Sequence, residues 1–131
     1  MAKGLYRQFP INIWDTNLFY EEMTPEEKYF YIYLLTAPQS NLSGCYQISL
    51  KKASDNLGYN RETVETLFNR LISLGLVEYD SETKEVYIPA FQSSWTRSPK
   101  YLGALHKELE EIESSKFYDA LYDLISEKEA C

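Results

Sequence analysis

The sequence has few of the residues on which metal sites and disulfide frameworks depend. Its 131 residues include one histidine and two cysteines, Cys45 and Cys131. That is too few for a convincing zinc site, and we expect neither a metal nor a cofactor. The cysteines lie far apart, so we expect them to be reduced and unpaired. No uncharged apolar run approaches a membrane span and the N-terminus lacks a signal-peptide layout, so we expect a cytoplasmic protein without membrane contact.

Aromatic and acidic residues, by contrast, are plentiful. Aromatic residues make up 15% of the chain, with 12 tyrosines, and 44% is hydrophobic, which excludes a disordered chain. The formal charge of -7 is unevenly divided. Residues 1–60 hold five Lys/Arg and six Asp/Glu, whereas residues 61–131 hold eight and fourteen. Most of the excess follows residue 100, so the acidity belongs mainly to the C-terminal segment and need not describe the middle of the chain.

Residues 24–37 carry the clearest helix signals. Thr24 is a good N-cap, Pro25 stands at the first helical position, and Glu27 completes a capping box. Pro38 ends the helix, because the residue before a proline disfavours the helical conformation. The interior, YFYIYLL, is apolar on nearly every side and predicts a central buried helix.

Two further helices and a hairpin follow. Ser49 and Gly58 delimit the first of these helices, and Asn60 and Gly75 delimit the second. A short strand is predicted within residues 44–49, and two strands around the turn SETK form a hairpin after the second helix. The second helix carries one apolar stripe at helical spacing. The stripe consists of Val64, Leu67, Phe68, Leu71 and Ile72.

The two ends of the chain differ in character. The opening segment, YRQFPINIWDTNLFYE, mixes aromatic and β-branched residues around a proline, which predicts a short extended segment rather than a helix. Beyond Pro99 the pattern indicates one or two amphipathic helices, with a break near Ser114 and Ser115.

The order of these elements is helix, short strand, helix, helix and hairpin, which is typical of the winged helix-turn-helix arrangement. The Gly-containing segment LGYN supplies the tight turn between the helix that ends at Gly58 and the helix that begins at Asn60. We therefore expect an α+β, mostly helical fold: a single winged-helix domain over residues 1–131. Its core is predicted at about residues 9–97 and its C-terminal helical extension at about 98–130. Such a chain could also be the N-terminal part of a longer protein.

Three motifs carry a family resemblance. They are TPEEK at the start of the first helix, LLTAPQSNLSGCYQI in the centre, and SPKYLGALHKEL after the hairpin. Over roughly residues 9–113 the chain resembles the N-terminal winged-helix domain of replisome organiser proteins from phages and mobile elements of low-GC Gram-positive bacteria, relatives of DnaD-like primosomal proteins. The resemblance implies binding of origin DNA and recruitment of other replication proteins, and it implies no catalysis.

If the helix after the LGYN turn contacts DNA, residues outside its apolar stripe must do so. Arginine can bind guanine bidentately, asparagine can pair with adenine, and serine or threonine can hold phosphate. Glu62 and Glu65 lie on or near the same face and repel phosphate, so an ordinary solvated helix face stays an open alternative. The candidates are Asn60, Arg61, Thr63, Thr66, Asn69, Arg70 and Ser73.

Lysines elsewhere supply further candidates for phosphate contact. Lys51 and Lys52 stand early in the preceding helix, where such modules contact the DNA backbone, although a lysine pair can also serve only solubility. Lys84 in the hairpin turn stands among acidic residues, which make a poor phosphate clamp. Lys3 and Arg7 could form an arm toward DNA.

The aromatic residues of the N-terminal third exceed what a small three-helix core easily hides. They predict either a core with half-buried tyrosines or a surface for self-association, where Tyr and Trp are favoured. The candidate oligomer interface consists of Trp14, Phe19, Tyr20, Tyr29 and Tyr33. The expected partners are double-stranded DNA, bound weakly by the isolated domain, replication proteins, and further copies of the chain.

No enzyme motif is present in the sequence. His106 has no nucleophile or acid at a suggestive spacing, and neither a phosphate-binding glycine loop nor a nucleophile elbow occurs. We therefore expect a binding protein and not an enzyme. Two alternatives to the replication module are a winged helix that docks proteins without contacting bases, and a small transcriptional regulator that binds a palindromic operator as a dimer.

Overall fold

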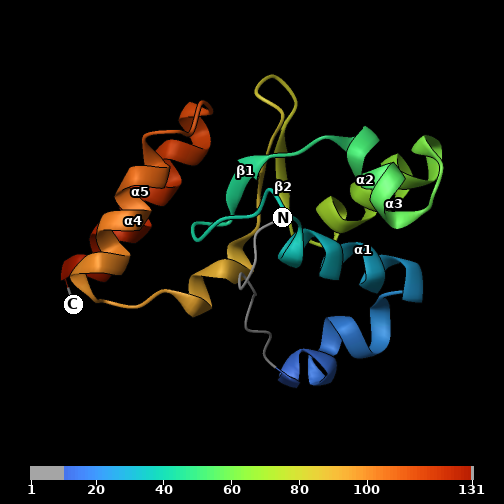
Figure 1. Ribbon diagram of the computed structural model, residues 1–131. Helices are drawn as coiled ribbons and strands as arrows, with labels where there is room; N and C mark the ends of the chain where they lie inside the picture. The colour runs from blue at the N-terminus through green and yellow to red at the C-terminus, as the bar shows by residue number, and fades with distance from the viewer. Residues whose placement is uncertain (1–10, 131) are drawn as a thin grey trace.

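The computed structural model describes residues 11–130, and these residues form a mostly helical fold with one small sheet (Figure 1). The α+β class expected from the sequence is confirmed. The sheet is antiparallel, with strand order β1-β3-β2. The elements are the short helices η1 (Ile11–Asp15) and η2 (Leu18–Glu22), then α1 (Pro25–Thr36), β1 (Cys45–Gln47), α2 (Leu50–Leu57), α3 (Arg61–Ser73), β2 (Glu78–Asp80), β3 (Glu85–Tyr87), η3 (Pro89–Ser94), α4 (Pro99–Leu109) and α5 (Ser115–Ala130).

The helix starts predicted from cap chemistry are confirmed. Thr24 Oγ1 accepts a hydrogen bond from the Glu27 amide at 3.2 Å, and Glu27 Oε1 accepts one from the Thr24 amide at 3.0 Å, which completes the capping box of α1. The side chains of Ser49 and Asn60 cap α2 and α3 by accepting the Lys52 and Thr63 amides. Gly58, with φ 85°, ends α2 in the left-handed conformation that glycine adopts without strain.

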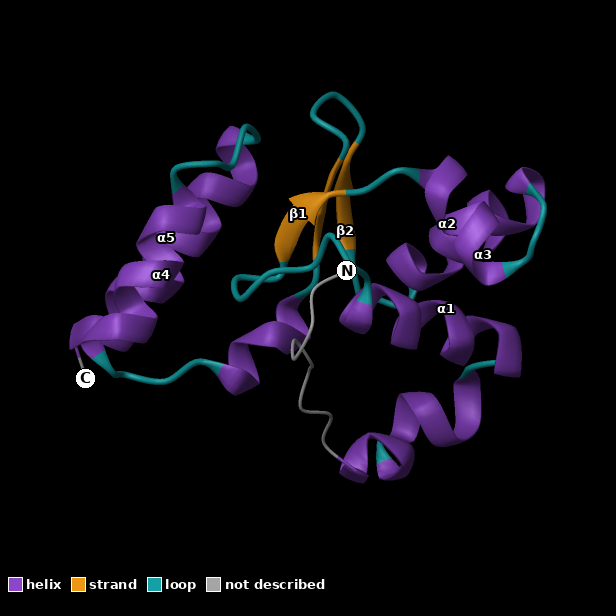
Figure 2. Cartoon of the chain, in the orientation of Figure 1, coloured by secondary structure: helices purple, strands orange, loops and turns teal. Residues whose placement is uncertain are grey.

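The sheet lies between two helical layers (Figure 2). Val86 of β3 and its cross-strand partner Tyr46 of β1 belong to the core that α1, α2 and α3 share. Tyr87 and its partner Cys45 point to the opposite face, into the core formed with α4 and α5. Because side chains alternate along a strand, β3 is buried on both faces, with β1 contributing one buried residue to each core.

Two carboxylates fasten the α4–α5 layer to the rest of the fold. Glu85 of β3 accepts backbone hydrogen bonds from Glu113 at 3.0 Å and Ser114 at 2.7 Å, just before α5. Glu108 of α4 accepts one from the Ser43 amide at 2.8 Å and another from the preceding amide at 3.2 Å. Carboxylates that accept backbone N–H groups make strong, charge-assisted bonds, so the C-terminal helices are held by specific contacts as well as by apolar packing.

The prediction of an extended N-terminal segment is wrong for the part that the structure describes. Residues 11–22 form η1 and η2 instead. The segment satisfies its backbone locally: the Thr16 amide donates to Ile13 O, and the Tyr20 amide donates to Thr16 O. Phe19 is buried, 2% exposed, and its ring packs against Tyr31 of α1 rather than into the sheet. The first five residues of the predicted segment lie outside the described part of the chain.

Cys45 is free and buried, as expected of a reduced cysteine. Burial, assisted by the nearby charge of Glu85, raises the pKa of its thiol to about 12. Cys131 lies outside the described residues. Between residues 11 and 130, no helix combines the length and apolar character needed to cross a membrane.

Candidate nucleic-acid interface

Helices α2 and α3 meet at a tight turn that the sequence builds from local bonds. The Gly58 amide donates to Ser54 O at 3.0 Å, and the Ser54 hydroxyl donates to the Tyr59 carbonyl. Asn60 Oδ1 then accepts the Thr63 amide at 2.8 Å and starts α3. Asn60 Oδ1 is thus engaged as the cap, and the side-chain NH₂ can still donate to a partner.

Helix α3 has one buried and one exposed face. Val64, Leu67, Phe68 and Leu71 are buried against α1 and α2, as the apolar stripe predicts, and Ile72 is half-buried. The most outward positions are all exposed, and they carry hydroxyl and amide groups with a single acid and no cation. These positions are Glu62, Thr66, Asn69 and Ser73.

Arg61 forms an ion pair on the surface of α3. Its Nε lies 3.2 Å from Glu65 Oε1, one helical turn away, with 56% and 52% of the two side chains exposed. Exposed pairs of this kind contribute about 0.3–0.5 kcal/mol. A ligand phosphate could therefore displace Glu65 at little cost, and Arg61 stays accessible.

Arg70 is bound much more firmly. Its Nε donates to Glu27 Oε2 at 3.1 Å, and Glu27, 8% exposed, uses its other oxygen to cap α1. Arg70 thus connects α3 to the start of α1, a structural role that the sequence did not indicate because the partner is 43 residues away. Its side chain is 46% exposed, so part of the guanidinium faces solvent.

Lys51 and Lys52 lie exposed in the first turn of α2. The structure gives neither of them an ion-pair partner among residues 11–130. They are therefore the unpaired cations closest along the chain to the turn that starts α3. Thr63 and Thr66, two further candidates, lie in α3. The Thr66 hydroxyl donates to the Glu62 carbonyl at 3.0 Å, so its hydrogen is already used within the helix.

The β2–β3 hairpin is acidic, as the sequence indicates. Asp80 accepts the turn amides of Glu82, at 2.9 Å, and Thr83. A hydrogen bond from the Ser114 side chain, with these amides, lowers the pKa of the Asp80 carboxyl. Lys84 stands at the end of the turn with φ 62°, an unusual conformation for a residue with a Cβ.

The acidic C-terminal helices lie on the far side of the sheet from α3 (Figure 1). Residues 99–130 hold four lysines and eight acidic residues, a net charge of -4. Salt screens exposed charges over about 8–10 Å. Because the sheet lies between α3 and the acidic helices, the charge of those helices adds little negative potential at the exposed, polar face of α3.

The predicted oligomer residues differ in their exposure and in their hydrogen-bond partners. Phe19 is in the core and cannot contribute an exposed side chain. Tyr29 donates its hydroxyl to the Leu57 carbonyl at 3.2 Å, and Tyr33 accepts a hydrogen bond from Asn56, so both join α1 to α2. Trp14 and Tyr20 are exposed, at 56% and 74%.

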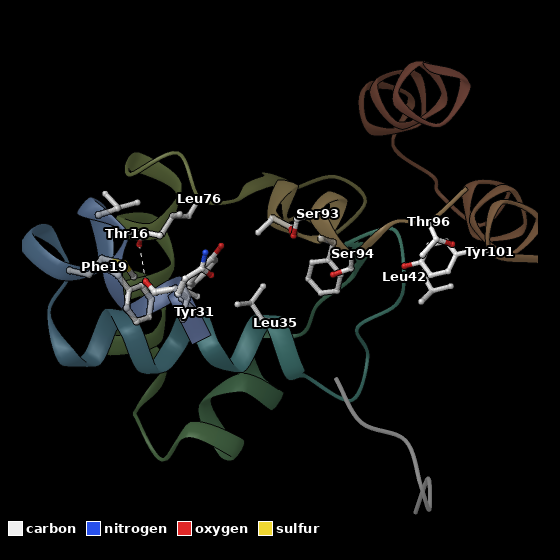
Figure 3. Close-up of a pocket in the computed structure, with 16 residues that line it drawn as sticks. Thr16, Phe19, Tyr31, Leu35, Leu42, Leu76, Ser93, Ser94, Thr96 and Tyr101 are labelled. Carbon is white, nitrogen blue, oxygen red and sulfur yellow. Dashed lines mark hydrogen bonds between the residues drawn. The ribbon is translucent and has the colours of Figure 1, made fainter. Parts of the chain in front are cut away.

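An apolar cavity of about 580 Å³ is lined in part by η1 and η2, the short helices that carry these two residues. In Figure 3 its labelled lining runs from Thr16 and Phe19 at one end, past Leu35, to Tyr101 at the other. No charged side chain of the described residues lines it. No pattern in the sequence indicates this cavity, because its walls come from segments that lie far apart along the chain. They are Asn12, Ile13, Thr16, Leu18, Phe19, Met23, Tyr31, Leu35, Leu42, Leu76, Ala90, Phe91, Ser93, Ser94, Thr96 and Tyr101.

The remaining candidates are isolated. His106 pairs with Glu129 at 3.0 Å and joins α4 to α5. Lys3 and Arg7 lie outside the described residues. Within residues 11–130 no cluster of His, Cys, Asp or Glu could hold a metal ion. Comparison of the chain with protein-family models, curated proteins and solved structures found no match.

Proposed function

We propose that the chain is a winged helix-turn-helix DNA-binding module of a phage-type replication organiser. One observation carries the proposal: α3 follows α2 through a tight turn, leads directly into the β2–β3 hairpin, and keeps its outer face uncovered by any described element. In that arrangement the second helix of the pair enters the major groove and the hairpin forms the wing. The role in replication, with recruitment of replication proteins, rests on the family resemblance of the sequence.

The charges predict a weak, phosphate-dominated interaction. Lys51 and Lys52 supply unpaired cations at the start of α2, and Arg61 can exchange Glu65 for a phosphate. Thr66 and Asn69 offer hydroxyl and amide groups toward base edges, whereas Glu62 opposes close approach. Binding through two or three phosphates and few bases has low affinity and little sequence preference.

A lysine-to-alanine comparison tests the proposed interface. Fluorescence anisotropy of a labelled duplex is measured with the wild type and with Lys51→Ala/Lys52→Ala, and we expect the double variant to bind at least about tenfold more weakly at low salt. Lys100→Ala/Lys107→Ala removes the same charge from α4, beyond the sheet, and is the matched control. Equal loss in both double variants would show a non-specific charge effect and remove the interface from α2.

The ion pairs of α3 favour a second candidate, a winged helix that docks proteins and does not contact bases. Arg61 and Arg70 both pair with glutamates, so a DNA phosphate would compete with a carboxylate for each guanidinium. If no duplex binds even at low salt while the chain stays folded, this second function replaces the first.

A further inference from the structure

The apolar cavity beside α1 has a polar edge that is open to solvent. Its volume of about 580 Å³ falls in the range of sites that bind ligands or groups of side chains. Phe19, Met23 and Leu35 contribute apolar walls. Ser94 and Thr96 line the same cavity and are exposed, so an occupant can enter along η3 and the segment that follows it.

Tyr31 brings a hydrogen-bond donor without an acceptor to the wall of this cavity (Figure 3). The residue is 5% exposed, and its ring packs against Phe19 with centroids 6.3 Å apart. Its hydroxyl makes no hydrogen bond within residues 11–130. Burial raises the pKa of this hydroxyl to about 12, so the group stays a donor at neutral pH. An occupant with a carbonyl oxygen can accept this hydrogen and offset the cost of burying the hydroxyl unpaired.

The two ends of the cavity differ in charge. Thr96 and Tyr101 line one end, and the exposed cations Arg97 and Lys100 lie between these two residues in the chain. Neither cation has an ion-pair partner in the part of the chain that the structure describes. Helix α4 also begins here, and the N-terminus of a helix favours negative charge. At the opposite end η1 finishes with Asp15, so a carboxylate is favoured only at the α4 end.

We propose that the cavity docks a peptide segment of another protein in which apolar side chains are followed by acidic ones. The apolar side chains pack on the cavity walls, a backbone carbonyl accepts the Tyr31 hydroxyl, and the acidic side chains face Arg97 and Lys100. A small uncharged molecule would use the walls and leave these cations without a partner. The inference goes beyond the proposed DNA binding and does not rest on it, because the DNA-contact candidates of α2 and α3, all of them described, do not line the cavity.

Fluorescence anisotropy with labelled synthetic peptides tests the docking. The probe is a short peptide in which a core of Leu, Phe and Ile is followed by a run of glutamates. One control peptide carries lysines in place of the glutamates, and another carries serines in place of the apolar core. We expect the probe to bind at least about tenfold more tightly than either control at low salt. Raising the salt concentration should reduce its advantage over the lysine peptide, because salt screens the contribution of the charges.

Three variants separate the charges from the cavity wall. Arg97→Glu/Lys100→Glu should weaken binding of the probe at least about tenfold and favour the lysine peptide. Lys107→Glu/Lys128→Glu makes the same charge change elsewhere on α4 and α5 and is the matched control. Tyr31→Phe should weaken the probe about two- to tenfold without changing duplex affinity, so peptide docking and DNA binding can fail independently. Thermal unfolding of each variant establishes that it is folded.

Several results would each overturn the proposal. They are no binding of the probe at protein concentrations up to about 1 mM, equal affinity for the lysine peptide, and equal weakening by the two double variants. Nile red, an uncharged apolar dye, supplies a further test. If the dye binds the chain and saturating probe does not displace it, the cavity takes a small apolar molecule and not the peptide. Displacement of the dye by the probe is the result that we expect.

Discussion

The guanidinium of Arg70 donates to the Glu27 carboxylate at 3.1 Å and ties the end of α3 to the start of α1. Glu27 is almost fully buried, with 8% of its side chain exposed, and its second oxygen caps the first turn of α1. The charge of Arg70 therefore compensates a carboxylate that the fold needs at this position. Arg70, one of the DNA-contact candidates predicted in α3, is therefore partly committed to stability.

The two arginines of α3 should contribute unequally to the free energy of unfolding. Arg70→Ala leaves Glu27 buried without its partner and should lower the free energy of unfolding by about 1–2 kcal/mol, a value reduced for the half-exposed arginine. Arg61→Ala breaks only an exposed pair and should cost about 0.3–0.5 kcal/mol. Urea denaturation measures both changes. A larger loss for Arg61→Ala would contradict the structural role of Arg70.

Glu85 should be the acidic residue of the hairpin that matters most for stability. It is 2% exposed and accepts the Glu113 and Ser114 amides. Glu85→Ala leaves both amides without an acceptor and should destabilise the chain by about 2–4 kcal/mol, with faster hydrogen exchange in α5. Glu82→Ala changes an exposed acid in the turn of the same hairpin and should stay within about 0.5 kcal/mol of wild type. Equal effects in the two variants would show that the Glu85 contact does not hold α5.

Two glycines should respond to alanine in opposite directions. Gly44 has φ 82°, and a Cβ there would lie 2.7 Å from the Ile88 carbonyl oxygen and 2.8 Å from Phe91 Cβ. Gly44→Ala should therefore destabilise the chain by more than about 2 kcal/mol. Gly103 lies inside α4 with no atom near the added Cβ, and Gly103→Ala should stabilise by about 0.5–1 kcal/mol. Thermal unfolding compares them, and stabilisation by Gly44→Ala is the result that is incompatible with this geometry.

The Cys45 thiol should be unreactive in the folded chain. Its pKa is raised from 9.0 to about 12, so the thiolate that reacts with disulfide reagents is scarce at about pH 8. Because the folded pKa exceeds the unfolded one, the unfolded state loses its proton first, and stability should fall as pH rises from about 9 toward 12. In a Cys131→Ser background, Ellman's reagent should label the chain rapidly only after unfolding. Rapid labelling of the native state would be inconsistent with this burial.

Local chemistry explains which parts of the fold could be predicted from the sequence. The caps at Thr24, Ser49 and Asn60 bond to amides three residues away, so adjacent residues contain the necessary information. The prediction of an extended N-terminal segment is wrong because aromatic and β-branched residues favour any half-buried environment, not only a strand. Phe19 is buried against α1 and not in the sheet.

Distant partners explain what could not be predicted. Arg70 lies 43 residues from Glu27, and Glu85 lies 29 residues from Ser114, so neither pair follows from periodicity or spacing. The cavity likewise depends on how η1, η2, α1 and η3 pack together. The sequence could predict the candidate helix α3, but it could not predict that Arg70 pairs with Glu27.

The salt dependence of duplex binding tests the central claim most directly. Anisotropy titrations at several salt concentrations between about 50 and 200 mM give the slope of log K against log salt, which is about -0.9 per phosphate contacted. For contacts through Lys51, Lys52 and Arg61 we predict measurable binding at low salt with a slope of about -2 to -3. Absence of binding at about 50 mM salt by a folded chain, or binding with a slope near zero, would contradict a DNA-binding function.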